Sequence, residues 1–68
     1  MNTQRERADV FLKGFAFGRK YAKRVSLGDA EKMGVKHTSA FLEGIEDSIS
    51  RDYFRYNLIL KKWRTPCR

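Results

Sequence analysis

The chain has almost no cysteine or histidine: Cys67 and His37 are the single representatives of each among 68 residues. One thiol cannot close an intramolecular disulfide, and one thiol with one imidazole falls short of the ligands of a structural zinc site. Cys67 follows Pro66 near the end of the chain, so we interpret it as a free thiol in a frayed tail, residues 65–68. This cysteine usage, without a signal-peptide pattern, favours an intracellular, cytoplasmic location.

Long apolar runs and strand-like segments are also missing. No stretch approaches the ~20 apolar residues that a membrane-spanning helix needs, so we expect no membrane span. No segment combines period-two alternation with many β-branched residues, which argues against a sheet. Proline, the strongest helix breaker, occurs only at position 66. These absences leave an all-α fold as the prediction, and 68 residues suffice for one domain, 1–68.

Acidic residues are scarce. Eight Asp and Glu face fifteen Lys and Arg, which gives a formal net charge of +7. Such an excess favours an acidic partner, whether nucleic acid, an anionic membrane or an acidic protein surface. The same excess also serves as a solubilising surface, so the function depends on whether the cations gather in patches.

What the sequence does contain is apolar residues at helical spacing. In the most regular stretch they return every three or four residues from Leu42 to Trp63. We predict two long helices over about 4–24 and 39–63, joined by a short helix or turn over about 27–34. Ser26 is placed to cap the short helix.

Glycines inside the predicted long helices occur at matching positions. Gly14 and Gly18 lie four residues apart in the first helix, and Gly44 stands in the second in the same frame as Gly14, Phe-Leu-charged-Gly-apolar. A glycine inside a helix costs ~1 kcal/mol relative to alanine, but it lets a second helix approach closely. We therefore interpret these glycines as the crossing point of two helices paired as a helical hairpin.

The middle of the chain partly resembles the helix-turn-helix of DNA-binding proteins. Residues 27–43 carry that motif's Ala30, Gly34 and Val35, with Gly34 suited to the left-handed position that ends a helix. The resemblance implies that the second helix enters a DNA groove. The sequence departs from the motif at Ala40, where a branched apolar residue is usual, and by the acidic residues that follow. A plain connection between two helices explains the same residues.

No set of residues points to catalysis. The chain has no glycine-rich phosphate-binding loop, no Cys/His cluster and no Ser-His-Asp set in a recognisable frame. Glu43, Glu46 and Asp47 lie close in sequence, but we interpret them as the solvated face of a helix. We therefore predict a protein that is not an enzyme and that has no cofactor, no metal site and no small-molecule substrate.

The basic residues form one group late in the first long helix and another late in the second. We predict that both groups bind nucleic-acid phosphates: Arg19, Lys20, Lys23, Arg24, Arg51, Arg55, Lys61, Lys62 and Arg64. Cations spaced along a surface bind the phosphate backbone, and Tyr21, Tyr56 and Trp63 are candidates for stacking on bases. If the long helices are antiparallel neighbours, the two groups lie apart, and the sequence leaves that orientation open.

Two functions fit this pattern. The first is a small basic accessory protein that binds DNA or RNA through its Lys and Arg side chains. The alternative is a helical protein-interaction module, an inhibitor or adaptor in the style of bacteriophage accessory proteins. Such a module would dock Phe54, Leu58 and Trp63 on a partner protein or on a second copy of itself. A role at a membrane surface fits less well, because the aromatic-rich apolar arc suits a core.

Overall fold

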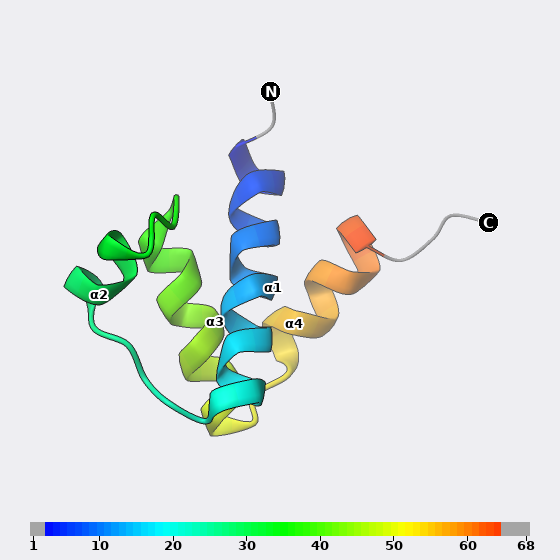
Figure 1. The fold of residues 1–68 in the computed structure, drawn as a ribbon. Coiled ribbons are helices and arrows are strands. Elements are labelled where there is room, and N and C mark those ends of the chain that lie inside the picture. Colours follow the sequence, from blue (N-terminus) through cyan, green and yellow to red (C-terminus); the bar gives the residue numbers. More distant parts are fainter. Residues whose placement is uncertain (1–2, 65–68) are drawn as a thin grey trace.

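The computed structural model describes residues 3–64, and every regular element in that range is a helix (Figure 1). The elements are α1 (Thr3–Tyr21), α2 (Leu27–Lys32), α3 (Thr38–Ser50), α4 (Phe54–Ile59) and a π-helical continuation, η1 (Leu60–Arg64). The predicted all-α class is confirmed. No helix in the described range is both long and apolar enough to cross a bilayer. The predicted tail at 65–68, with Pro66 and Cys67, lies outside the described residues.

Helices α1 and α3 form the centre of the fold and run in the same direction (Figure 1). Their register shows this direction. A Cβ atom added at Gly14 would meet the backbone of Phe41, and one added at Gly18 would lie 2.9 Å from Cβ of Ser48. Residue numbers therefore rise together along both helices. The predicted hairpin-like pairing of the two long helices is confirmed in that α1 and α3 pack side by side. The two helices are parallel, however, because the segment that contains α2 carries the chain back to the starting end of α1.

Glycine permits this close approach of the two helices. A Cβ atom at Gly14 would overlap the carbonyl oxygen of Phe41, and one at Gly44 would overlap the carbonyl oxygen of Phe11. The backbone of each helix thus lies directly against a glycine of the other, because only glycine leaves that space free. The repeated frame around Gly14 and Gly44 correctly predicted the crossing point.

The core lies between α1, α2 and α3. Phe15 and Ile45 are its most enclosed large side chains, each only 1% exposed. The other buried members of this cluster are Val10, Phe11, Ala30, Ala40 and Phe41. Burial of apolar surface at these positions contributes roughly 25 cal/mol per Å² and is the main force that holds the helices together.

The short helix α2 begins and ends as the sequence predicts. The hydroxyl of Ser26 accepts a hydrogen bond from the Asp29 N–H at 3.1 Å. Gly34 adopts a left-handed φ of 77°, and the N–H of Val35 donates to the carbonyl of Ala30 at 3.4 Å. This is the Schellman arrangement, in which a glycine ends the helix and the next residue returns to the core.

Helix α1 ends at Tyr21, earlier than the predicted end at residue 24. Ala22 adopts a left-handed φ of 50°, and its N–H donates to the carbonyl of Gly18 at 2.8 Å. Lys23 and Arg24 consequently lie in the loop after α1 and not on its surface. This correction changes which cations α1 itself can present.

The predicted long helix over 39–63 is interrupted at residues 51–53 and becomes α3 and α4. Arg51 adopts a left-handed φ of 59°, and the N–H of Asp52 donates to the carbonyl of Asp47 at 2.9 Å. A second Schellman arrangement therefore ends α3. The Asp52 carboxylate then accepts a hydrogen bond from the Phe54 N–H at 3.1 Å, which supports the start of α4.

Because of this interruption, α4 and η1 turn back beside α1 (Figure 1). The ring of Tyr56 stacks on Phe15 with the ring centroids 4.2 Å apart, and Ile59 packs against the core. Trp63 is half-buried, and the guanidinium of Arg5 lies 5.7 Å from its ring centroid. The chain thus forms a two-helix centre with α2 against α3 and α4 against α1.

Candidate nucleic-acid interface

The parallel pairing brings the C-terminal ends of α1 and α3 to the same end of the molecule (Figure 1). Arg19 and Lys20 occupy the last turn of α1, Lys23 follows it, and Arg51 follows α3. We call these four residues the basic end. Helix C-termini carry partial negative charge, so cations there also stabilise the helices. The two basic groups predicted from the sequence therefore meet in part, at this end.

A groove at the basic end joins the two groups. Seven residues line this terminal groove of about 260 Å³: Gly18, Arg19, Ala22, Ser48, Ile49, Arg51 and Tyr53. Arg19 and Arg51, which lie far apart in sequence, are both exposed here, and the lining contains no carboxylate. The buried Ser48 hydroxyl has no hydrogen-bond partner among the described residues. The terminal groove therefore offers two guanidinium groups to an anion without an acidic competitor in its wall.

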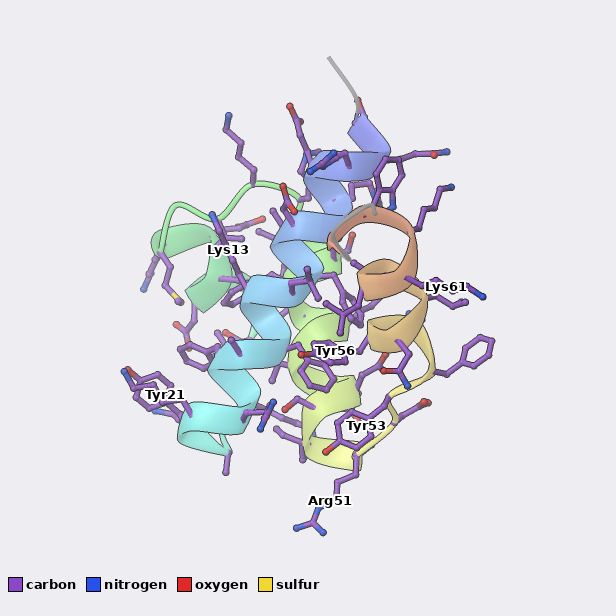
Figure 2. All side chains as sticks on the ribbon, turned by 90° about the vertical axis from the view of Figure 1, so that its right-hand side faces the viewer. Lys13, Tyr21, Arg51, Tyr53, Tyr56 and Lys61 are labelled. Atoms are coloured by element: carbon purple, nitrogen blue, oxygen red, sulfur yellow. The ribbon has the colours of Figure 1, made fainter. Side chains whose placement is uncertain are left out.

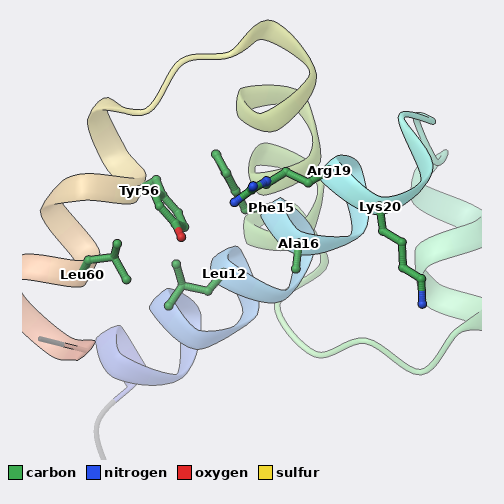
Figure 3. A pocket seen from close by; sticks show the side chains of 7 residues that line it. All are labelled: Leu12, Phe15, Ala16, Arg19, Lys20, Tyr56 and Leu60. Atoms are coloured by element: carbon green, nitrogen blue, oxygen red, sulfur yellow. The ribbon is translucent and has the colours of Figure 1, made fainter.

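A second groove continues from the first along α1. This α1–α4 groove of about 490 Å³ is lined by Leu12, Phe15, Ala16, Arg19, Lys20, Tyr56 and Leu60. Arg19 lines both grooves, and Figure 3 shows its side chain reaching over Phe15 toward Tyr56. Lys20 extends away from Tyr56 in the same view. The floor is apolar and the charges stand at one end, next to the terminal groove.

Two tyrosines stand where the grooves meet. Tyr53 is 45% exposed, and Tyr56 is half-buried by its stacking on Phe15. The rings of Tyr53 and Tyr56 meet edge to face, with centroids 6.3 Å apart. The sequence pointed to Tyr56 as a stacking candidate but not to Tyr53. The interruption after α3, signalled by Asp52, is what leaves Tyr53 at the surface.

Arg24, one of the predicted phosphate-binding residues, is paired with a carboxylate of α3. Its Nε and Nη2 donate to the two carboxylate oxygens of Glu46 at 2.7 and 3.1 Å. The hydrogen bonds from Arg24 and from the Ser50 hydroxyl lower the pKa of Glu46, and the carboxylate raises the pKa of Arg24. A bidentate pair of this kind occupies the planar face with which arginine would bind a phosphate.

Arg55 is half-exposed and is also paired with carboxylates of α3. Its guanidinium lies 3.1 Å from Glu43 and 3.3 Å from Asp47. Asp47 is buried, and that burial raises the pKa of its carboxyl group even though Arg55 partly counteracts the shift. Of the three acidic residues interpreted from the sequence as a solvated face, Glu43 and Glu46 are exposed, whereas Asp47 is buried, and all three lie close to Arg24 or Arg55. The opposite face of α3 packs on α1.

Lys61 and Lys62 lie away from the basic end. Figure 2 shows Arg51 at the lower end of the molecule and Lys61 well above it, on the segment that follows α4. The ammonium of Lys62 lies 4.9 Å from the ring centroid of Trp63, beside the start of α1. The side chain of Arg64 lies outside the described residues. The basic group predicted late in the second long helix is thus divided between the two ends of the molecule.

The remaining stacking candidates are not at the grooves. Tyr21 is 54% exposed and packs against Phe17 with the ring centroids 4.7 Å apart, while Lys20 lies 5.3 Å from its ring. Trp63 lies in a hollow formed with the first turns of α1. Tyr21 remains accessible at the basic end, whereas Trp63 is partly covered by the protein itself.

Within residues 3–64, no three His, Cys, Asp or Glu side chains are grouped so that they could hold a metal ion. The chemistry that the grooves can offer is therefore cationic and aromatic: guanidinium and ammonium groups beside tyrosine rings. No protein-family model, no curated protein and no solved structure matches this chain.

Proposed function

We propose that the protein is a small, non-enzymatic accessory protein of the cytoplasm that binds nucleic acid through its basic end. The single observation that supports this most directly is the terminal groove, whose lining contains Arg19, Arg51 and Tyr53 but no carboxylate. Guanidinium groups bind phosphate oxygens through paired N–H donors. Two of them beside an exposed aromatic ring form the cation-and-ring arrangement by which proteins hold a nucleic-acid strand.

The proposal uses only part of the predicted set. The four residues of the basic end contact phosphates, while Arg24 and Arg55 stay in their ion pairs with α3. Lys61 and Lys62 add only a long-range attraction, because salt screens charges over roughly 10 Å at 0.1 M ionic strength. Contacts of this kind position a strand but do not read its bases, so binding is independent of sequence.

Binding of labelled oligonucleotides, followed by fluorescence anisotropy in a salt titration, tests the proposal. Contact with four phosphates predicts that affinity falls ~100-fold between about 50 and 200 mM salt, because counterions are released on binding. Single-stranded DNA, duplex DNA and RNA are compared, since stacking on Tyr53 would favour the single strands. Arg19→Gln should flatten the log–log salt slope by about 0.7–0.9. No binding at low salt would remove the proposal.

Replacing Arg51 with glycine should make the protein more stable but a weaker binder of nucleic acid. Arg51 occupies a left-handed conformation, which costs a non-glycine residue ~1–2 kcal/mol. Arg51→Gly should therefore raise the free energy of unfolding by about 1 kcal/mol. It should also weaken nucleic-acid binding several-fold, because one guanidinium is lost from the terminal groove. Chemical denaturation and anisotropy on the same variant measure both effects.

Ala22→Gly is the matched control for Arg51→Gly. Ala22 has the same left-handed conformation and also lines the terminal groove, but it carries no charge. Its replacement should stabilise the protein by a similar ~1 kcal/mol and leave binding unchanged. If Arg51→Gly and Ala22→Gly bound oligonucleotide equally well, Arg51 would have no part in the interface.

A further inference from the structure

The outer face of α4 is apolar and largely exposed among residues 3–64. Phe54 is 70% exposed and Leu58 is 50% exposed, four residues apart and therefore on one side of the helix. The opposite side carries Tyr56 and Ile59, which pack against the core. Phe54 and Leu58 therefore contribute little to the core, and their exposed apolar surface is available to a binding partner.

The charges around this face have one sign. Lys61 follows Leu58 by three residues and points away from the core, and Lys62 follows it by four (Figure 2). Between Tyr53 and Arg64 the sequence contains no acidic residue. Asp52, just before this stretch, already accepts the hydrogen bond from the N–H of Phe54. We call Phe54, Leu58, Lys61 and Lys62 the α4 face: an apolar pair with cations at one end.

This composition argues against a second copy of the chain as the occupant. Two α4 faces brought together would place lysines near lysines or near Arg51, and only the carboxylate of Asp52 lies close enough in the sequence to pair with them. Like charges brought together in an interface are unfavourable. A partner with carboxylates around an apolar centre avoids the charge problem.

We propose that the α4 face binds an acidic amphipathic helix of a partner protein. The partner's apolar side chains cover Phe54 and Leu58, and its carboxylates pair with Lys61 and Lys62. Recognition of an amphipathic helix by apolar anchors at i and i+4 is a recurrent mode of peptide binding. This inference goes beyond nucleic-acid binding, since the α4 face shares no residue with the basic end and the two ligands do not compete for the same groups.

Selection from a displayed random library of helical peptides, using the nuclease-treated full chain as bait, tests the inference. We expect enrichment of peptides with apolar residues at i and i+4 among Asp and Glu. Phe54→Ala should lower the affinity for the enriched peptides at least tenfold, since a central aromatic anchor contributes most of the binding energy of such an interface. Lys61→Glu should lower this affinity as well. Leu27→Ala, a change at a side chain that is 53% exposed on α2, is the control that should leave binding unchanged.

Several outcomes would overturn the inference. One is enrichment of peptides without acidic residues, or no enrichment at all. A second is equal binding by Phe54→Ala and the unmodified chain. A third is a stable dimer in analytical ultracentrifugation that Phe54→Ala dissociates, because the occupant would then be a second copy. Because all of these residues are exposed, the substitutions leave the core intact, and circular dichroism confirms the fold of each variant.

Discussion

Replacing Gly14 with alanine should leave the protein largely unfolded. The added Cβ would overlap the carbonyl oxygen of Phe41, which belongs to the backbone of α3 and cannot rotate away as a side chain can. Helices α1 and α3 would have to separate along the interface that forms the centre of the fold. We expect a loss of about 3 kcal/mol or more, at the upper end of what overpacking usually costs.

That loss is large in relation to what a chain of this size can possess. A domain of 68 residues has one small core, and such cores rarely supply more than about 3–5 kcal/mol. The gain in helix propensity from glycine to alanine, ~1 kcal/mol, does not compensate for the overlap. Gly44→Ala should have a comparable effect, since its Cβ would overlap the carbonyl oxygen of Phe11 from the other side of the interface.

Gly28→Ala provides the matched control for both substitutions. Gly28 lies in α2, and a Cβ atom added there would meet nothing within 4 Å. Stability should be unchanged or rise by up to ~1 kcal/mol, because alanine is the better helix former. Urea denaturation followed by far-UV circular dichroism compares the three variants. If Gly14→Ala were as stable as Gly28→Ala, the close approach of the two helices would be wrong.

The sequence was sufficient to predict this interface because glycines inside a helix are costly and need a reason. The common frame of Gly14 and Gly44 therefore pointed to a crossing of two helices. The same frame did not say whether the helices run in the same or in opposite directions, since a glycine permits close approach in either case. The direction follows from how residues 22–37 return along the pair, which depends on packing across distant segments.

The end of α3 was harder to predict, because apolar spacing continues through it without a change of period. The interruption depends on Arg51 in a left-handed conformation, a position where glycine is usual and would have been recognised. The available signal was Asp52, whose carboxylate accepts a hydrogen bond from the N–H of Phe54 at the start of the next helix. An aspartate on an otherwise apolar stripe favours a helix start over a buried charge, since burial without a partner is costly.

The sequence could not predict which cations pair with carboxylates, because these pairs also depend on contacts between distant segments. Arg24 and Arg55 are opposed by Glu46, and by Glu43 and Asp47, across elements that meet only in the folded chain. The sequence correctly predicted that basic residues lie near the C-terminal ends of helices, where the helix dipole favours positive charge. The tertiary structure then places two of these cations, Arg24 and Arg55, beside carboxylates of α3.

The strongest test of the basic end is a double charge reversal. Arg19→Glu with Arg51→Glu places two carboxylates in the terminal groove and should reduce oligonucleotide affinity by at least ~100-fold at low salt. Phosphates would be repelled at the position where the strand is held, and the salt slope should fall by at least about half, because Lys20 and Lys23 remain. Both side chains are exposed, so the core is expected to remain intact. Anisotropy with the oligonucleotides of the salt titration measures the effect.

A second double variant separates this local effect from net charge. Lys61→Glu with Lys62→Glu changes the net charge by the same amount, from +7 to +3, but at positions away from the basic end. It should reduce oligonucleotide affinity no more than about tenfold, through long-range attraction alone, and should abolish binding of acidic peptides to the α4 face. The Arg19/Arg51 variant should retain peptide binding. Equal losses of oligonucleotide affinity in the two variants would mean that only overall charge matters and that the terminal groove is not a site.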